Sequence, residues 1–374
     1  MLHAENILSG KCPEIRVTAA ADRRESRRIW AREKFPEAKI YAEGSDLIDD
    51  AACDAVLIAT PHYQHPTLAV QALEKGLHVM SEKPAGVYTL QVREVIAAAD
   101  RHPELTYALM YNQRTNCVYR KAKALLEAGE LGAMKRMNWI ITDWYRAQSY
   151  YDAGAWRATW DGEGGGVLLN QCPHQLDLLQ WLCGLPVRVH AFTHEGKWHD
   201  IEVEDDVTAY MEFEGGATGV FIASTGDAPG VNRLEILGTR GRLLVENDRL
   251  LFERNAVDER EWCFADVPPF SAPETQIVPT ELDGRNGQHA EVLNAFAAHI
   301  LRGEPLVADG REGIRGLMLS NAMHLSGWTG ETVALPIDEQ RFLELLNERR
   351  AASRHKEDAK DVAMDTAGSF GRSR

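Results

Sequence analysis

The stretch Gly164-Gly165-Gly166-Val167-Leu168-Leu169-Asn170-Gln171-Cys172-Pro173-His174-Gln175-Leu176-Asp177 decides how the rest of the chain is interpreted. Its three glycines allow the backbone to pass close to another segment. The apolar residues that follow recur at helical spacing until Gly184, which can cap the end of a helix. Because a mid-helix proline is disfavoured and Pro173 suits the first helical position, the helix begins either before Asn170 or at Pro173.

Asn170, His174 and Asp177 fall at i, i+4 and i+7, so we expect this polar trio to project outward from one face while the leucines pack on the other. With a start at Pro173, Asn170 lies in the preceding turn, about one turn from His174. A capped surface helix with an ordinary histidine explains the same pattern. The stretch alone does not decide between a functional site and such a helix.

Composition limits the class of protein. The 374 residues are 44% hydrophobic, which indicates a globular chain of two domains. The net charge of −15 argues against nucleic acid or an anionic membrane as a partner, since both require a basic face, and leaves small neutral ligands open. The six scattered cysteines are typical of reduced thiols, and we see neither a signal peptide nor an apolar run of roughly 20 residues. We therefore expect a cytoplasmic protein.

Strands alternate with amphipathic helices in the first third of the chain, after an initial helix over residues 1–10. Such an alternation predicts βαβ units and a parallel, doubly wound sheet. In these sheets ligands bind beyond the carboxyl ends of the strands, where Asp22, Thr60-Pro61 and Glu82-Lys83-Pro84 fall. The expected strands cover residues 14–21, 39–42, 54–60, 77–81 and 106–111.

Beyond a helix at 118–128 the strands follow one another with few helices between them. This pattern predicts a second domain with a largely antiparallel sheet. We expect a loop over 258–287, helices over 289–302 and 311–326, and a disordered tail over 354–374, where the residues are charged and small. The expected strands of the second domain cover residues 135–143, 187–193, 207–213, 218–223, 233–237, 242–246 and 250–254.

Several short motifs together resemble the Gfo/Idh/MocA family, whose name derives from glucose-fructose oxidoreductase, inositol dehydrogenase and rhizopine catabolism. Each motif alone is weak, but their order and spacing from about residue 2 to 336 are specific. The motifs are Thr60-Pro61 with His65, Glu82-Lys83-Pro84, Gly129-Glu130-Leu131-Gly132, Trp156-Arg157, the glycine triplet with His174 and Asp177, and Ile236-Leu237-Gly238-Thr239-Arg240-Gly241.

The resemblance implies a Rossmann-type dinucleotide-binding domain over 1–115 and a substrate-binding and oligomerisation domain over 116–336 with an open-faced, mainly antiparallel sheet. It implies a nicotinamide cofactor and hydride transfer to or from a secondary hydroxyl of a sugar, cyclitol or glycoside. Family members commonly pair through the sheet face, so a homodimer or homotetramer is expected.

One departure from the family pattern is large. The G-x-G-x-x-G loop of the family lies between the first strand and the first helix, about 20 residues before an acidic residue at the end of the second strand. Counting back from Asp22 places its last glycine near residue 1. We therefore expect the glycine loop and the first strand of the sheet to be absent, with Met1 an internal methionine taken as the start.

Removing a hydride from a carbinol carbon requires the hydroxyl proton to leave, so the site needs a base and a positive group beside the developing alkoxide. Of the family-matched residues, His174 suits the first role and Lys83 the second, and the resemblance suggests a cis bond at Pro84 that aims the lysine. Asp177 is expected to orient the imidazole or to bind a substrate hydroxyl. The position four before the histidine, often aspartate in the family, is Asn170 here, which forms hydrogen bonds but supplies no charge.

Asp22 is placed to bond both ribose hydroxyls of the adenosine half, which favours NAD over NADP, although Arg23 beside it could meet a 2′-phosphate. Arg114 resembles a family position near cofactor and substrate, and a domain-linking salt bridge explains it equally well. We expect cofactor contacts from Asp22, Arg23, Thr60, Pro61, His65, Glu82 and Lys83, and substrate contacts from Arg114, Trp156, Arg157 and Asn170.

No metal site is expected, because His194, His199 and Asp200 lack a further ligand at suitable spacing. Two rivals to a dehydrogenase stay open. One is a redox-neutral NAD-dependent glycosidase or lyase, which oxidises its substrate only transiently. The other is a non-catalytic binding protein of the same fold, favoured by the missing glycine loop and opposed by the presence of Lys83 together with His174.

Overall fold

The computed structural model describes residues 2–354, which form two compact units. The first unit contains residues up to 116 and residues 286–317, and the second contains residues 117–285 and those from 318 onward. The chain thus returns to the first unit after the large sheet. The expected division into domains 1–115 and 116–336 does not contain this return. The expected tail lies outside the described residues except for Arg354.

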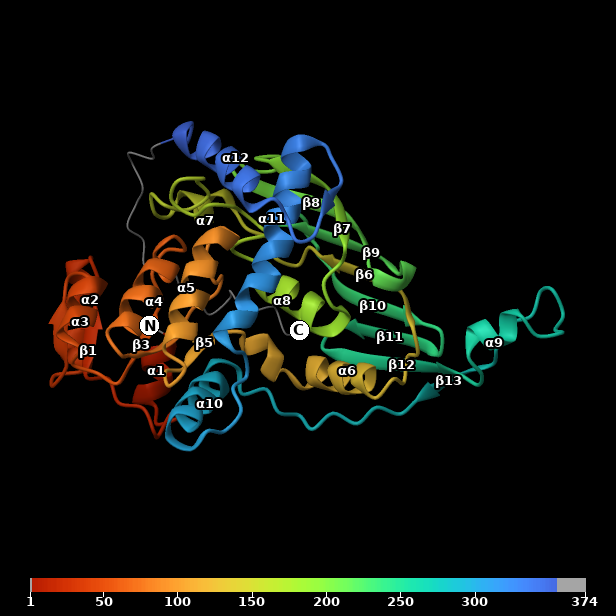
Figure 1. Cartoon of the computed structure of the whole chain (residues 1–374), viewed down its shortest axis with the longest axis horizontal. Coiled ribbons are helices and arrows are strands. Elements are labelled where there is room, and N and C mark those ends of the chain that lie inside the picture. Colours follow the sequence, from red (N-terminus) through yellow and green to blue (C-terminus); the bar gives the residue numbers. More distant parts are fainter. Residues whose placement is uncertain (1, 355–374) are drawn as a thin grey trace. The chain divides into compact units, whose positions relative to one another are not determined.

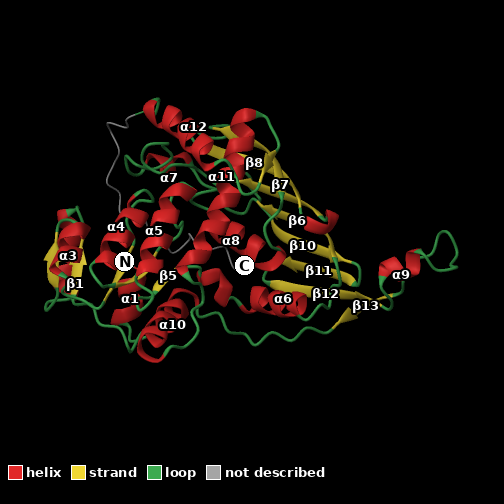
Figure 2. Ribbon diagram, in the orientation of Figure 1, coloured by secondary structure: helices red, strands yellow, loops and turns green. Residues whose placement is uncertain are grey.

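Short parallel strands form the sheet of the first unit, as the alternating pattern predicted (Figure 2). Strand β1 pairs with β2, and β3, β4 and β5 form a separate group of three. The strand expected over 14–21 is much shorter, because Ile15 turns back to hydrogen-bond the Cys12 carbonyl and the partner β2 is only three residues long. The bounds are β1 (Ala19–Ala21), β2 (Lys39–Tyr41), β3 (Ala55–Ile58), β4 (His78–Ser81) and β5 (Tyr107–Leu109).

The two groups of strands are separate because no strand among the described residues joins β1 to β3. In a doubly wound sheet of order 3-2-1-4-5-6 the first strand occupies this place. The break therefore falls where the sequence predicted that a strand is absent. All three residues of β1 are partly exposed, and Leu57 of β3 is 36% exposed, whereas strands inside a parallel sheet are covered on both faces.

Helix α10 explains why the chain returns to the first unit (Figure 1). Val292, Leu293 and Phe296 of this helix share one buried cluster with Met80 of β4 and Ala108 beside it in β5. The helices of the first unit are α1 (Leu2–Leu8), α2 (Glu25–Lys34), α3 (Gly44–Asp50), α4 (Gln64–Glu74), α5 (Thr89–Arg101) and α10 (Gln288–Arg302), with 3₁₀ turns η1 (Asn112–Thr115) and η3 (Gly310–Glu312).

A nine-stranded sheet dominates the second unit, in the order β13-β12-β11-β10-β6-β9-β8-β7-β14. Every neighbouring pair is antiparallel except β6 and β9, which confirms the predicted, largely antiparallel domain. The strands are β6 (Met134–Ile141), β7 (Arg188–Glu195), β8 (Glu204–Glu212), β9 (Thr218–Ser224), β10 (Asn232–Gly238), β11 (Gly241–Glu246), β12 (Arg249–Asn255), β13 (Thr275–Val278) and β14 (Val333–Ala334).

One face of this sheet is covered and the other is open. Tyr119 of α6 packs on Trp139 of β6 with ring centroids 6.1 Å apart, whereas Phe192 and Tyr210 on the opposite face are 60% and 44% exposed. The remaining elements are α6 (Cys117–Glu127), α7 (Gln148–Asp152), α8 (Pro173–Cys183), η2 (Glu214–Gly216), α9 (Glu259–Cys263), α12 (Glu339–Ala351) and α11 (Gly313–Thr329), whose first turn belongs to the first unit.

Two expectations for the second unit were incomplete. The expected loop over 258–287 contains the short helix α9 and the strand β13, and α12 was not predicted. Both helices begin at an aspartate whose side chain accepts a backbone N–H, Asp258 from Arg260 and Asp338 from Arg341. Between residues 2 and 354, none of the helices is long and apolar enough to span a bilayer.

Candidate active site

Helix α8 begins at Pro173 and is followed by Gly184 with φ of 80°. Asn170 therefore lies in the preceding turn, where its N–H donates to the Gly166 carbonyl at 2.9 Å. The expected outward polar face is wrong, because His174 is only 9% exposed and Asp177 only 1%. Burial of these groups is tolerated when they are hydrogen-bonded, as Asp177 is by the Gln180 amide at 3.0 Å.

The glycine triplet passes directly against strand β8, as the sequence indicated. A Cβ atom at Gly166 would lie 1.9 Å from the backbone oxygen of Glu204. The fully buried carboxylate of Glu204 accepts the N–H groups of Gly166 at 2.8 Å and Leu168 at 2.9 Å. His324 Nε2 lies 2.9 Å from the same carboxylate. This buried acid thus fixes the loop that leads into α8.

Three of the predicted substrate residues belong to one cluster in the second unit. The Arg157 guanidinium lies 4.7 Å from the ring centroids of both Trp156 and Tyr150. Arg157 donates to the Tyr150 hydroxyl at 2.9 Å, and that hydroxyl lies 3.4 Å from Asn170 Oδ1. Asn170 also donates to Glu163. Sequence reasoning missed Tyr150 and Glu163, and the only signal was an acidic residue directly before the glycine triplet.

In the first unit, Glu82-Lys83-Pro84 follows β4, and the peptide bond between Lys83 and Pro84 is cis, as the resemblance suggested. The Glu82 carboxylate accepts hydrogen bonds from His3 at 2.6 Å and from the Lys83 backbone N–H at 3.1 Å. Burial alone would raise the pKa of Glu82, but His3, Lys83 and His289 outweigh it and lower the pKa to about 2. Glu82 is therefore an anion directly beside Lys83.

His65 joins the ends of β3 and β4. Its ring nitrogens lie 2.6 Å from the Thr60 carbonyl and 2.9 Å from the Pro84 carbonyl, and the residue is 1% exposed. Burial lowers the pKa of His65. The ring thus supports the two loops, and the cofactor contact expected of His65 stays a prediction.

Asp22 follows β1, where its carboxylate accepts the Arg24 N–H at 2.8 Å and keeps 38% of its side chain exposed. The neighbouring Arg23 is 68% exposed and pairs with Glu43 at 2.8 Å. Arg114 is buried and donates to Glu312 at 2.9 Å. Both partners belong to the first unit, so the domain-linking salt bridge considered from the sequence is not formed by this pair.

These residues fit a nicotinamide dinucleotide in part. A partly exposed carboxylate at a strand end, Asp22, suits ribose hydroxyls. The buried Thr60 hydroxyl has no hydrogen-bond partner within the described residues, so a ligand could satisfy it. No described residue supplies the glycine-rich turn that usually holds the pyrophosphate. Within the described residues, Asp22 and Thr60 therefore offer groups that a dinucleotide could use, and no glycine-rich turn accompanies them.

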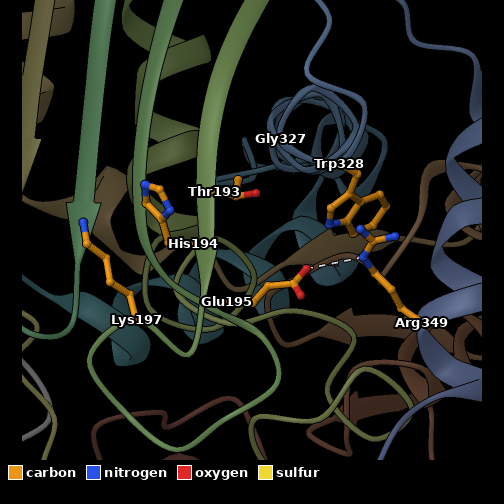
Figure 3. A pocket seen from close by; sticks show the side chains of 7 residues that line it. All are labelled: Thr193, His194, Glu195, Lys197, Gly327, Trp328 and Arg349. Atoms are coloured by element: carbon orange, nitrogen blue, oxygen red, sulfur yellow. Dashed lines mark hydrogen bonds and ion pairs between the residues drawn. The ribbon is translucent and has the colours of Figure 1, made fainter.

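A separate hollow of about 450 Å³ lies in the second unit, lined by residues of β7, α11 and α12 and the turn after β7. Figure 3 shows Arg349 and Glu195 facing each other, 3.3 Å apart, beside the Trp328 ring. None of the predicted site residues lines this hollow. His199, considered above as a metal ligand, forms hydrogen bonds through its ring nitrogens with the Asp205 carboxylate at 2.8 Å and the Arg146 carbonyl at 2.9 Å.

Two family models match the chain, one for each part of the expected architecture. The model described as "Oxidoreductase family, NAD-binding Rossmann fold" matches residues 3–109, and "GFO/IDH/MocA C-terminal domain" matches residues 119–244. Together they span most of both sheets. The first part of the chain is therefore an NAD-binding Rossmann domain.

Individual relatives agree with this assignment. The chain is 24% identical over 342 residues to myo-inositol 2-dehydrogenase of Thermotoga maritima, with 86% of this chain and 91% of the relative covered. It is 26% identical over 324 residues to D-xylose 1-dehydrogenase (NADP(+)) 2 of Haloferax volcanii, with 86% and 93% covered. The solved WlbA dehydrogenase of Chromobacterium violaceum, in complex with NADH and UDP-GlcNAcA, has a TM-score of 0.77 and 27% identity, with 90% of this chain and 94% of that chain covered.

Proposed function

Since the chain belongs to the Gfo/Idh/MocA family of NAD-binding oxidoreductases, we propose that it transfers a hydride between NAD and a secondary hydroxyl of a sugar, cyclitol or glycoside. The observation that carries the proposal is Lys83. It follows β4 at a strand end of the NAD-binding domain, directly after the partly buried anion Glu82 and before a cis proline. A cation in this place suits the stabilisation of a developing alkoxide.

Bound NAD supplies the hydride acceptor, and the side chains of this protein handle the proton. In our proposal the Lys83 ammonium stabilises the alkoxide and His174 receives the hydroxyl proton. Asp177 supports His174 from within α8, and Asn170 with Arg157 bind other hydroxyls of the substrate. The amide and guanidinium of these two residues offer donors that match a polyhydroxylated ring.

Asp22 supports a preference for NAD over NADP. A carboxylate accepts hydrogen bonds from the ribose 2′-hydroxyl and repels a 2′-phosphate. Relatives differ in this respect, since the Haloferax volcanii enzyme is named for NADP and the WlbA structure contains NADH. Arg23, the residue that could favour NADP, is already paired with Glu43.

The names of the relatives support a cyclic polyhydroxylated substrate. Myo-inositol, D-xylose and the sugar of UDP-GlcNAcA each offer at least two adjacent hydroxyl groups. All three relatives are named as dehydrogenases, so the redox-neutral glycosidase or lyase and the non-catalytic binding protein are not favoured. The cytoplasmic location expected from the sequence stays a prediction.

The test is an assay of this protein with NAD⁺ or NADP⁺ and each of myo-inositol, D-xylose and UDP-GlcNAcA, followed by the absorbance of the reduced cofactor. We expect NADH to accumulate with at least one of them. Lys83→Ala and His174→Ala should each lower turnover by roughly 10²-fold or more, because positioned acid–base groups contribute that much. The control is Lys75→Ala. This lysine forms an ion pair with Asp49 at 3.2 Å and is not one of the proposed site residues.

Two results would contradict the proposal. The first is the absence of energy transfer from the tryptophans to added NADH, which would mean that the protein binds no cofactor. The second is turnover of a substrate that stays within about tenfold of the parent in both the Lys83 and the His174 variants.

We also propose that copies of the chain associate through the open face of the nine-stranded sheet. Phe192 and Tyr210 are exposed there, and Tyr210 pairs across strands with Val220. Farther along the sheet, β10 and β11 carry the ion pairs Arg233–Glu246 at 3.4 Å and Arg242–Glu235 at 2.9 Å. A sheet face that carries exposed aromatic side chains and charges of both signs is suited to a symmetric contact with a second copy.

A further inference from the structure

Glu163 is a buried carboxylate, 2% exposed, directly before the glycine triplet. Its Oε2 accepts the backbone N–H of Ala158 at 2.7 Å, and its Oε1 accepts a hydrogen bond from Nδ2 of Asn170. Both oxygens of Glu163 act as acceptors here, so the amide of Asn170 turns its NH₂ group toward Glu163. The acid thereby determines which way this amide faces.

The oxygen of the Asn170 amide consequently faces Tyr150, whose hydroxyl lies 3.4 Å away. The same hydroxyl accepts a hydrogen bond from Arg157 at 2.9 Å. All donors therefore point in one direction, from Arg157 through Tyr150 and Asn170 to Glu163. With a cation at one end and a carboxylate at the other, each bond polarises the next.

The same carboxylate holds the turn that carries Arg157. Ala158, the next residue, is fully buried and has φ of 53°, in the left-handed region that side chains rarely adopt. Its N–H is the one that Glu163 accepts. One acid thus supports both Arg157 and Asn170, which come from different turns of the chain.

We propose that Glu163 is a positioning residue of the substrate site, holding the Asn170 amide and the Arg157 turn in the single arrangement that meets the substrate hydroxyls. The inference rests on the proposed function, because it assumes that Asn170 and Arg157 bind the substrate. A carboxylate is an unfavourable choice for merely filling this space. Burial raises the pKa of Glu163, against the opposing effect of Arg157, and so works against the charged form.

Two single variants disturb this arrangement in different ways. Glu163→Gln offers one acceptor oxygen to two donors, so keeping the Ala158 bond forces the Asn170 amide to reverse and to present its NH₂ group to Tyr150. We expect kcat/KM to fall by roughly 10- to 10²-fold, the cost of misplacing substrate-binding groups. Asn170→Asp places a second carboxylate against Glu163, and we expect a larger loss together with a lower melting temperature.

The double variant Glu163→Gln with Asn170→Asp restores every donor and acceptor. The glutamine oxygen accepts from Ala158, its NH₂ group donates to Asp at position 170, and that carboxylate accepts from Tyr150. Only the place of the charge has changed. We expect kcat/KM of the double variant to return to within about tenfold of the parent and to exceed that of both single variants, since residues in contact are coupled.

Glu202→Gln is the matched control. The Glu202 carboxylate also accepts two backbone N–H groups, those of Trp160 and Arg354 at 2.8 Å each. Its kcat/KM should stay within about twofold of the parent. The substrate in all assays is whichever compound of the panel above reduces NAD⁺, and melting temperatures are measured for all five proteins.

Restoration of kcat/KM in the double variant supports the proposal. Losses that simply multiply in the double variant would overturn it, and so would single variants that melt earlier but turn over substrate as the parent does. If the parent binds NADH but oxidises none of the panel, the proposed function fails, and the hydrogen-bonded arrangement of positions 163 and 170 is then tested by stability. The melting temperatures would then still show whether positions 163 and 170 are coupled, so the two failures can be told apart.

Discussion

His289 links the protonation of the first unit to its stability. The residue is 8% exposed, and its ring lies 5.4 Å from that of His3, which in turn donates to Glu82. Burial lowers the pKa of His289 to about 4, although the Glu82 carboxylate opposes this effect. A histidine in the unfolded chain has a pKa of about 6.5. Between these values the unfolded state binds a proton that the folded state does not.

We predict that stability falls as the pH is lowered from about 6.5 to 4, by up to about 3 kcal/mol from this residue. Glu82 adds almost nothing to this pH dependence. Its pKa is lowered to about 2 in the folded state, so the stability it contributes is lost only below its pKa in the unfolded chain, near 4.3. Denaturant unfolding at pH 7 and 4.5 should therefore show a smaller difference for His289→Gln than for the parent. The control is His194→Gln at an exposed position, and equal differences in the parent and His289→Gln would contradict the assignment.

Asp22 is the residue that we expect to decide between the two nicotinamide cofactors. Asp22→Ala should weaken NADH binding by roughly tenfold or more, because hydrogen bonds to a charged acceptor are lost. The affinity for NADPH should fall less, since the repulsion of the 2′-phosphate is removed at the same time. Titration by energy transfer from tryptophan to each reduced cofactor measures both affinities. Asp49→Ala, at an acid paired with Lys75, is the control, and an unchanged Kd for NADH in the Asp22 variant would refute this role.

At the scale of single residues, the family resemblance singled out Trp156, Arg157 and Asn170 as substrate residues. The structure brings these three into one cluster, and their substrate contacts stay predictions. The sequence could not predict Glu163 or Tyr150. Their contacts depend on where the turns between residues 147 and 172 place them, and no periodic pattern specifies those turns. The burial of His174 and Asp177 was missed for a related reason, since spacing reveals which residues share a helix face but not what covers that face.

The glycine triplet is the element on which the second unit depends most. A methyl group at Gly166 would lie 1.9 Å from the backbone oxygen of Glu204, and a backbone atom in a central strand cannot move away as a flexible side chain can. We predict that Gly166→Ala costs at least about 3 kcal/mol and lowers the melting temperature by roughly 10 °C. Gly44→Ala is the control, because a Cβ atom there would meet only a Leu68 methyl group at 3.4 Å. Equal melting temperatures for the two variants would exclude the close approach.

At the scale of elements, most long and regular patterns were predicted well, α12 being an exception, and the short ones α9 and β13 were missed. The helices α5 and α10 and the strands β6 to β12 lie within a few residues of their expected positions. Helix α9 has five residues and β13 four, too few for a period to be recognised. The break between β1 and β3 agrees with the expectation of an absent first strand, which rested on a missing motif rather than on periodicity.

At the scale of the whole molecule, the order of patterns along the chain was sufficient to predict two sheets of different type. Alternating strands and helices gave way to consecutive strands, and the structure has a parallel sheet in one unit and a mainly antiparallel one in the other. The return of residues 286–317 to the first unit was not predicted. It depends on the packing of α10 against β4 and β5, which is a contact between segments about 200 residues apart in the sequence.

Self-association through the open sheet face is the last prediction, and it has to overcome the repulsion between chains of net charge −15. We expect the parent protein to be oligomeric in size-exclusion chromatography with light scattering, and more strongly so at high salt, which screens this repulsion and leaves apolar burial intact. The combined variant Phe192→Glu with Tyr210→Glu should be monomeric, because it buries two unpaired carboxylates in the contact. Leu301→Glu, at a residue 60% exposed on α10 of the first unit, is the matched control and should keep the parent's mass. An oligomer that survives in the Phe192 and Tyr210 variant would place the contact elsewhere, and a monomeric parent would exclude the association altogether.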